Sequence, residues 1–214
     1  MESMVSYTPV DGEMKPFDQR KRLIVVRIAA AAAVALLLFT RPFLSDGSEG
    51  HELLELLGIV LVSLCVLGRL WSILYIGGAK NRELISLGPF SMTQNPLYFF
   101  STVGAVGIGL IYGSTEAASL LGFVSFLIFR YTARREAKFL LAKFGNAYST
   151  YASSTPRFWP NPLLYRDVAE SYFSTHALKR TFYDGLFFLA VFPAIEICEY
   201  LRDTIRLPAI FTLY

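Results

Sequence analysis

The chain has 214 residues, of which 54% are hydrophobic and only 17% are charged, and its mean hydropathy is +0.44. Soluble domains carry about a quarter of charged residues. These values therefore exclude an ordinary soluble domain and indicate an integral membrane protein. The formal net charge of +3 follows from basic residues placed between apolar segments, so we expect no nucleic-acid partner.

Five apolar segments are candidates for membrane helices, which need about 20 mostly apolar residues. They cover Leu23–Phe39, Leu53–Ile76, Pro96–Tyr112, Glu116–Tyr131 and Phe182–Leu201. The residues before the first segment are too polar and acidic for a cleavable signal sequence. We therefore predict an all-α, polytopic membrane protein with a tail over residues 1–22, a membrane-integral core over residues 23–181, and an additional helix with its tail over residues 182–214.

The distribution of basic residues predicts the orientation, because cytoplasmic loops carry an excess of Lys and Arg. Basic residues precede the first segment, follow the second and follow the fourth, whereas the loops on the other side are mainly acidic. We expect the N-terminus in the cytoplasm and the C-terminus outside. The compact chain favours a bacterial cytoplasmic membrane.

The cysteines and histidines predict neither a disulfide nor a metal site. Cys65 and Cys198 each fall within a predicted span, where a cysteine acts as a small buried hydrophobic residue. His51 and His176 are far apart and share no metal-ligand spacing with the cysteines. We therefore expect no metal.

The third and fourth segments are joined by so few residues that they must form a tight antiparallel hairpin. Gly104, Gly107 and Gly109 are the small residues that close helix packing in a membrane favours.

After the fourth segment the chain is predicted to stay helical as far as Thr155-Pro156, since the residue before a proline is disfavoured in a helix. Residues at steps of three and four that would share one helix face support this helix: Glu136, Leu140, Phe144, Tyr148 and Tyr151. Residues 163–180 alternate apolar and polar positions, which predicts a second helix lying in the membrane interface.

The third segment is predicted to start with Asn95 as its N-cap and Pro96 as its first helical residue. Such a helix start is a natural binding site for an anion. Aromatic residues surround it, namely Phe90, Tyr98, Phe99 and Phe100. They offer flat apolar surface for an adenine ring or a lipid chain, or alternatively form an interfacial aromatic belt.

Two longer phrases add to this pattern. They are "GRLWSILYIGGAKNRELISLGPFSMTQNPLY" before the hairpin and "REAKFLLAKFGNAYSTYASSTPRFWP" after it. Read together, the chain resembles the isoprenylcysteine carboxyl methyltransferase family and its phospholipid methyltransferase relatives. In that family a Gly-Pro-Tyr and Arg-His-Pro-x-Tyr phrase precedes a hairpin, and Glu-Glu-x-x-Leu-x-x-x-Phe-Gly-x-x-Tyr-x-x-Tyr follows it.

The resemblance implies that the core is methyltransferase-like and holds S-adenosyl-L-methionine at the cytoplasmic end of the hairpin. The cofactor contacts that it implies are Arg82, Glu83, Leu84, Ile85, Phe90, Asn95, Pro96, Leu97, Tyr98 and Glu136. A carboxylate there would hold the ammonium of the cofactor. Alternatively, Glu136 forms an ordinary interfacial ion pair with Arg135 or Lys143.

The chain departs from the family wording at four places. Phe90 replaces the usual Tyr, Gln94-Asn95 replaces Arg-His, Ala137 replaces the second Glu, and Thr132 stands where carboxylate-methylating members carry Arg. The last change puts the acceptor in doubt. Arg130 and Arg134 flank Thr132 and are, with Glu136, our catalytic candidates; alternatively both are ordinary basic residues of a cytoplasmic loop.

We therefore expect a membrane-embedded methyltransferase that uses S-adenosyl-L-methionine and acts on a lipid-like or small hydrophobic acceptor from the bilayer. The alternatives are an NADPH-dependent reductase similar to the steroid 5-alpha-reductases, and a non-catalytic lipid-binding relative. Membrane lipids are the expected partners. Arg69 and Glu196 are ionisable groups inside predicted spans, which makes both functional candidates, although their depths argue against a pair.

Overall fold

The computed structural model describes residues 40–42, 49–76, 83–167, 173–205 and 211–213. Their elements in chain order are β1 (Thr40–Pro42), α2 (Glu49–Ile76), α3 (Pro89–Met92), α4 (Pro96–Ile111), α5 (Thr115–Phe144), α6 (Asn146–Ser154), the 3-10 helix η1 (Pro162–Leu164), α7 (Thr175–Ile205) and β2 (Phe211–Leu213). The predicted first span, Leu23–Phe39, lies outside the described residues.

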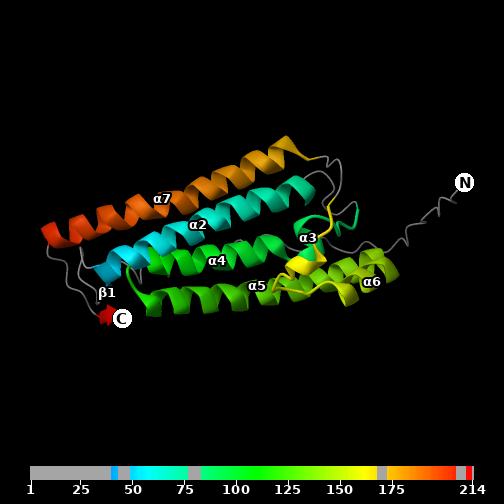
Figure 1. Ribbon diagram of the computed structural model, residues 1–214, viewed down its shortest axis with the longest axis horizontal. Coiled ribbons are helices and arrows are strands. Elements are labelled where there is room, and N and C mark those ends of the chain that lie inside the picture. Colours follow the sequence, from blue (N-terminus) through cyan, green and yellow to red (C-terminus); the bar gives the residue numbers. More distant parts are fainter. Residues whose placement is uncertain (1–39, 43–48, 77–82, 168–172, 206–210, 214) are drawn as a thin grey trace, which may run out of the picture.

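Four long helices run side by side in the order α7, α2, α4 and α5 (Figure 1). The short elements α3, α6 and η1 gather at one end of these helices, and the strands lie at the other end. The predominantly helical fold is confirmed. The small parallel sheet, in which Thr40 of β1 pairs with Phe211 of β2, was not predicted.

The predicted tight hairpin is confirmed, because residues 112–114 alone join α4 to α5. Gly113 has φ 76, a conformation that favours glycine. Ser114 then caps α5 by accepting a hydrogen bond from the Ala117 amide at 3.0 Å. Turn and cap together reverse the chain within these three residues.

The three hairpin glycines face different neighbouring helices. A Cβ added at Gly109 would collide with the backbone of Ala118 in α5, as the hairpin requires. Gly107 instead faces α2, where an added Cβ would lie 2.8 Å from the Gly58 carbonyl oxygen. Gly104 likewise faces Cys65, a buried free cysteine of α2. Backbone approach therefore holds α2, α4 and α5 together.

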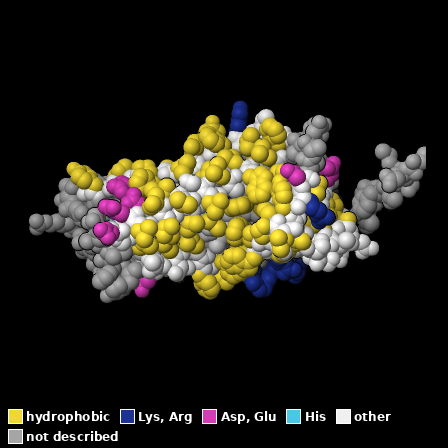
Figure 2. All heavy atoms as spheres, viewed as in Figure 1, with side chains coloured by type: hydrophobic (Ala, Val, Ile, Leu, Met, Phe, Trp, Pro, Cys, Tyr) yellow, Lys and Arg dark blue, Asp and Glu magenta, His cyan; other side chains and the backbone are white. Residues whose placement is uncertain are grey.

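Two of the described helices, α2 and α5, are long and apolar enough to cross a membrane. Helix α4 is apolar but has 16 residues, and so spans about 24 Å. Apolar side chains cover the middle of the face in Figure 2, basic ones lie from there toward the α3 and α6 end, and an acidic cluster marks the opposite end. These features indicate membrane association; five spans and their orientation stay predictions.

The continuous helix predicted after the fourth span is interrupted. Helix α5 ends at Phe144, Gly145 adopts φ 53, and α6 restarts at Asn146. The predicted end is confirmed, since Thr155 before Pro156 is extended. The periodic pattern continued across Gly145 and so concealed the break, because a positive φ leaves no trace in hydrophobic spacing.

The interfacial helix predicted over residues 163–180 is wrong. The chain forms η1, after which Arg166 pairs with Gly88 in an antiparallel bridge. Thr175 then begins α7, which runs without a break through the predicted boundary at residue 182. The amphipathic pattern combined η1 and the bridge at Arg166 with the first turns of a long helix, while residues 168–172 lie outside the described residues.

Candidate functional site

The end of the molecule that carries α3 and α6 is built from residues 83–98 and 146–167, which we call the polar cap (Figure 1). Its first turn depends on Gly88, which has φ 60 and leaves no room for a side chain against the ring of Tyr75. The Gly88 amide donates to the Arg166 carbonyl at 2.7 Å. Ser91 Oγ donates to the Gly88 carbonyl and accepts from the Arg166 amide at 2.9 Å. The strand-like segment at Arg166 therefore fixes the turn before α4.

Gln94 connects this turn to α6. Its Nε2 donates to the carbonyls of Thr155 at 2.6 Å and Ala152 at 3.2 Å. Its Oε1 accepts from the hydroxyl of Tyr148 at 3.1 Å. The amide is thus saturated by its own chain, and this departure from the family wording has a structural role.

Helix α4 begins at Pro96 as predicted, but the predicted side-chain cap is wrong. Asn95 Nδ2 donates to the Arg157 carbonyl at 2.8 Å and makes no cap hydrogen bond. The amides of Tyr98 and Phe99 both donate to the Asn95 carbonyl, at 3.1 Å each. Proline has no N–H, and the Tyr98 and Phe99 amides are already bonded, so the helix start has few donors left for an anion.

Tyr98 joins the start of α4 to α5. Its hydroxyl donates to Glu136 Oε2 at 2.9 Å, and its ring stacks on Phe129 at a centroid distance of 5.2 Å and an angle of 12°. Both Tyr98 and Glu136 are half-buried. The structure therefore brings together two expected site residues that are 38 positions apart in the sequence.

The two basic alternatives for Glu136 lie over aromatic rings. The Arg135 guanidinium lies 5.1 Å from the Tyr131 ring centroid, and the Lys143 ammonium lies 5.8 Å from that of Phe144. The hydrogen bond that the structure describes at the Glu136 carboxylate comes from the Tyr98 hydroxyl.

Two buried tyrosines of α6 complete the cap. Tyr151 donates to the Phe90 carbonyl at 2.7 Å, and burial raises its pKa well above the usual range, so it stays a protonated donor. Burial also raises the pKa of Tyr148; Glu136 adds to this shift and Arg157 opposes it. Both charges therefore lie within electrostatic range of Tyr148.

The two arginine candidates are not brought to Glu136 by any contact described in the structure. Arg130 and Arg134 are exposed, and the Arg130 guanidinium lies 5.7 Å from the ring centroid of Phe126. Thr132 is buried and donates to the Ile128 carbonyl at 2.9 Å. Thr132 is uncharged, so it places no cation beside Glu136 where the family has an arginine.

The other expected cofactor contacts differ in their exposure to solvent. Phe90 and Pro96 are buried, Leu84, Ile85 and Leu97 are half-buried, and Glu83 is exposed; Arg82 lies outside the described residues. Within the part of the chain that the structure describes, no group of three His, Cys, Asp or Glu side chains could hold a metal ion.

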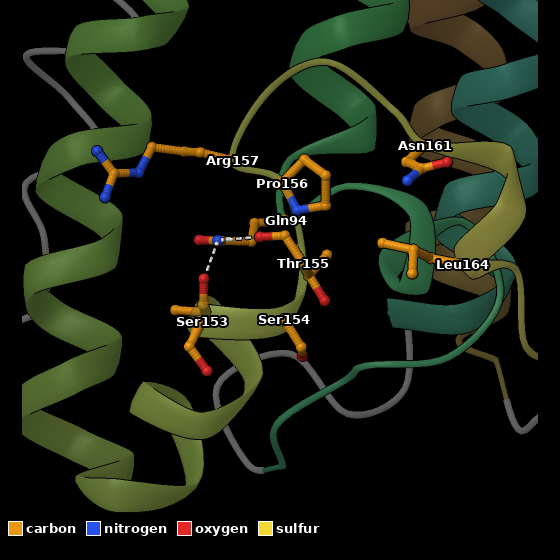
Figure 3. A pocket seen from close by; sticks show the side chains of 9 residues that line it. Gln94, Ser153, Ser154, Thr155, Pro156, Arg157, Asn161 and Leu164 are labelled. Carbon is orange, nitrogen blue, oxygen red and sulfur yellow. Dashed lines mark hydrogen bonds between the residues drawn. The ribbon is translucent and has the colours of Figure 1, made fainter.

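The sequence did not predict an open cleft of about 540 Å³ beside Gln94 (Figure 3). It is lined by Gln94, residues 152–157, Asn161 and Leu164. The proline-rich phrase "TPRFWPNP", in which Arg157 and Asn161 each follow a proline, could have pointed to this turn. Only the fold places it beside Gln94.

Arg69 connects three helices near the polar cap. Its Nη1 donates to Ser101 Oγ of α4 at 2.5 Å, and its Nη2 lies 3.6 Å from Asp184 Oδ2 of α7. The Phe188 ring lies 5.7 Å from the guanidinium carbon. Glu196 is exposed on α7. Arg69 thus has a packing role between helices.

Comparison with known proteins places this sequence in a family. The sequence model described as phospholipid methyltransferase matches residues 54–147, a segment that includes both Tyr98 and Glu136. No solved structure is significantly similar to the chain.

Two curated relatives match nearly end to end. The cobalt-zinc-cadmium resistance protein CzcN of Cupriavidus metallidurans is 34% identical over 92% of this chain and 90% of its own length. The nickel-cobalt-cadmium resistance protein NccN of Alcaligenes xylosoxydans xylosoxydans is 30% identical over 98% of this chain and 99% of its own. The family model matches the middle of the chain, and these relatives match almost its whole length. The chain therefore belongs to the phospholipid methyltransferase family.

Proposed function

We propose that the chain is a membrane-embedded methyltransferase that uses S-adenosyl-L-methionine and acts on a lipid-like or small hydrophobic acceptor. The observation that carries this proposal is the 2.9 Å hydrogen bond from Tyr98 to Glu136. It lies inside the segment that matches the family. It also sets a carboxylate and two stacked rings side by side at the base of the hairpin.

This group of residues fits the cofactor chemically. Tyr98 occupies one oxygen of Glu136, and the other oxygen is the acceptor that we assign to the cofactor ammonium. Aromatic rings attract a cationic centre, so Tyr98 and Phe129 suit a sulfonium. When bound, S-adenosyl-L-methionine supplies an activated methyl group. The expected contacts at residues 82–85, Phe90 and residues 95–97 form the rest of the proposed site.

The chain's own contribution is mainly positioning, because an activated methyl group needs little acid-base help. Tyr98 and Glu136 orient one another at the interface between α4 and α5. The acceptor would approach along the exposed apolar side chains of α5, such as Phe123 and Leu127. We assign Arg130 and Arg134 to steering an anionic acceptor at the surface, since both are exposed.

Calorimetric titration of the purified full chain with S-adenosyl-L-methionine tests the cofactor assignment. We expect Glu136→Gln to weaken binding by about tenfold or more, as loss of a charge-assisted contact should. Glu52→Gln is the matched control, because Glu52 is an exposed carboxylate in the first turn of α2. Equal affinity for all three proteins would refute the role of Glu136.

One further titration and one transfer assay separate the rival functions. Binding of NADPH instead of S-adenosyl-L-methionine would favour a reductase. Transfer of labelled methyl groups to a membrane lipid extract would exclude a non-catalytic lipid-binding protein. Identification of the labelled product would name the acceptor.

The names of the two relatives suggest a biological setting. Both are called resistance proteins for cobalt, cadmium and either zinc or nickel. We propose that methyl transfer by this chain supports tolerance of divalent metal ions. A host strain that lacks the protein should grow poorly in these metals, and wild-type protein but not Glu136→Gln should restore growth. Restoration by the variant would separate tolerance from the proposed site.

A further inference from the structure

The amino-acid end of S-adenosyl-L-methionine carries two opposite charges, an ammonium and a carboxylate. Glu136, with one oxygen held by Tyr98, is assigned to the ammonium. The carboxylate needs a different partner, either a set of free backbone N–H groups or a cation. The residues around Glu136 have to supply that partner if both charges are held.

The start of α4 leaves few N–H groups for this carboxylate. Pro96 has none, and the amides of Tyr98 and Phe99 both donate to the carbonyl of residue 95 at 3.1 Å. The Asn95 side chain is engaged as well, because its Nδ2 donates to the Arg157 carbonyl at 2.8 Å. The helix start therefore binds mainly its own chain, and a cation is the better partner for the carboxylate.

Arg157 lies in a suitable place to be this cation. Figure 3 shows its side chain turned toward α5, on the opposite side of Gln94 and Pro156 from Asn161. The side chain is exposed. Among the residues that the structure describes, no carboxylate forms an ion pair with its guanidinium. The guanidinium is therefore available to a ligand beside α5.

Arg157 and Glu136 both act electrostatically on one tyrosine. Burial raises the pKa of Tyr148, Glu136 adds to this shift, and Arg157 opposes it. The Tyr148 hydroxyl, which donates to Gln94 Oε1 at 3.1 Å, thus lies within range of both charges. A carboxylate on α5 and a guanidinium on the segment after α6 match the two opposite charges of an amino-acid end.

The departures from the family wording at the start of α4 support the same arrangement. Gln94 and Asn95 stand where the family has Arg-His, so that guanidinium is missing here. Both residues bind the segment that carries Arg157. The Gln94 amide donates to the Pro156 carbonyl at 2.8 Å, and Asn95 donates to the next carbonyl along the chain. These two contacts fix the backbone from which the Arg157 side chain extends.

We propose that Arg157 is a further cofactor-binding residue, which holds the carboxylate of S-adenosyl-L-methionine while Glu136 holds the ammonium. This assignment rests on the proposed function. The planar guanidinium suits both carboxylate oxygens through two parallel hydrogen bonds. A methyl donor that lacks the carboxylate should therefore bind less tightly than S-adenosyl-L-methionine.

Calorimetric titration of the purified full chain with S-adenosyl-L-methionine and with its decarboxylated analogue tests this assignment. The analogue keeps the adenosine, the sulfonium and the ammonium but has no carboxylate. We expect Arg157→Gln to weaken binding of S-adenosyl-L-methionine about tenfold and to leave binding of the analogue unchanged. Arg157→Lys should lose less, because it keeps the charge but not the two-pronged geometry. Glu136→Gln should weaken both ligands, since both carry the ammonium.

Arg135→Gln is the matched control, because it removes an exposed cation next to Glu136 whose guanidinium lies over the Tyr131 ring. It should leave both affinities unchanged. Three results would overturn the role of Arg157 and leave the proposed function intact: normal binding of S-adenosyl-L-methionine by Arg157→Gln, equal weakening of both ligands in that variant, or an equal loss in Arg135→Gln. If the wild-type protein bound neither ligand, the proposed function would fail together with this assignment.

Discussion

The polar cap and the helical bundle are specified in different ways. In the cap, segments about 60 residues apart are joined by hydrogen bonds between particular polar atoms, as between Gln94 and Thr155 or between Tyr151 and Phe90. In the bundle, α2 and α4 meet through glycines, with Gly58 and Gly107 in mutual backbone contact. The cap therefore depends on the identity of particular polar atoms. The bundle depends instead on glycines, which place no side chain where the helices touch.

This difference matters because the proposed site lies where the two regions meet. Tyr98 and Glu136 belong to bundle helices, yet α4 begins in the cap at Pro96. A change in bundle volume should disturb the whole fold. A change in a cap hydrogen bond should act locally and reach the site through Asn95 and Gln94.

The largest effect should come from Gly107→Leu. A Cβ at this position would lie 2.8 Å from the Gly58 carbonyl oxygen, so α2 and α4 must separate. We expect a loss of about 3 kcal/mol in the free energy of unfolding, as overpacking of a close contact produces. Ala190→Leu, on the exposed side of α7, is the control. Denaturation in mixed micelles measures both, and similar stability of the two variants would contradict glycine-mediated packing.

An intermediate effect is expected from Gln94→Ala. The change removes the partner of Tyr148 and of two backbone carbonyls, and should cost about 2 kcal/mol. The damage should be local: hydrogen exchange should accelerate in α6 and stay unchanged in α2. Ser149→Ala, an exposed change within α6, controls for helix propensity. Uniform acceleration along the chain would show that the cap is not a separate unit.

The sequence predicted the bundle better than the cap for a physical reason. Helix starts and ends carry local signals, such as Pro96 at the start of α4 and Pro156 after α6. The hairpin followed from the short connection at Gly113. Apolar periodicity could not show the break at Gly145, nor which neighbour each hairpin glycine would face.

The polar contacts of the cap could not be predicted from such local signals. Gln94 and Asn95 bind backbone carbonyls of residues 152–157, and a side-chain bond to a distant carbonyl imposes no spacing on the sequence. The family resemblance did lead to Tyr98 and Glu136 as neighbours. Arg130 and Arg134 were added because they flank Thr132, and both are exposed on α5. The assignment of the full site stays a prediction.

The smallest effect should come from Asp184→Asn. Asp184 is 55% exposed and lies 3.6 Å from Arg69, so the ion pair should contribute less than about 1 kcal/mol. Arg69→Gln should cost more, since Arg69 is 17% exposed and also donates to Ser101 at 2.5 Å. A double-mutant cycle of the two changes measures their coupling in the free energy of unfolding. Coupling above about 2 kcal/mol would mean that a single polar contact also holds α7 in the bundle. The bundle would then depend on particular polar atoms, as the cap does.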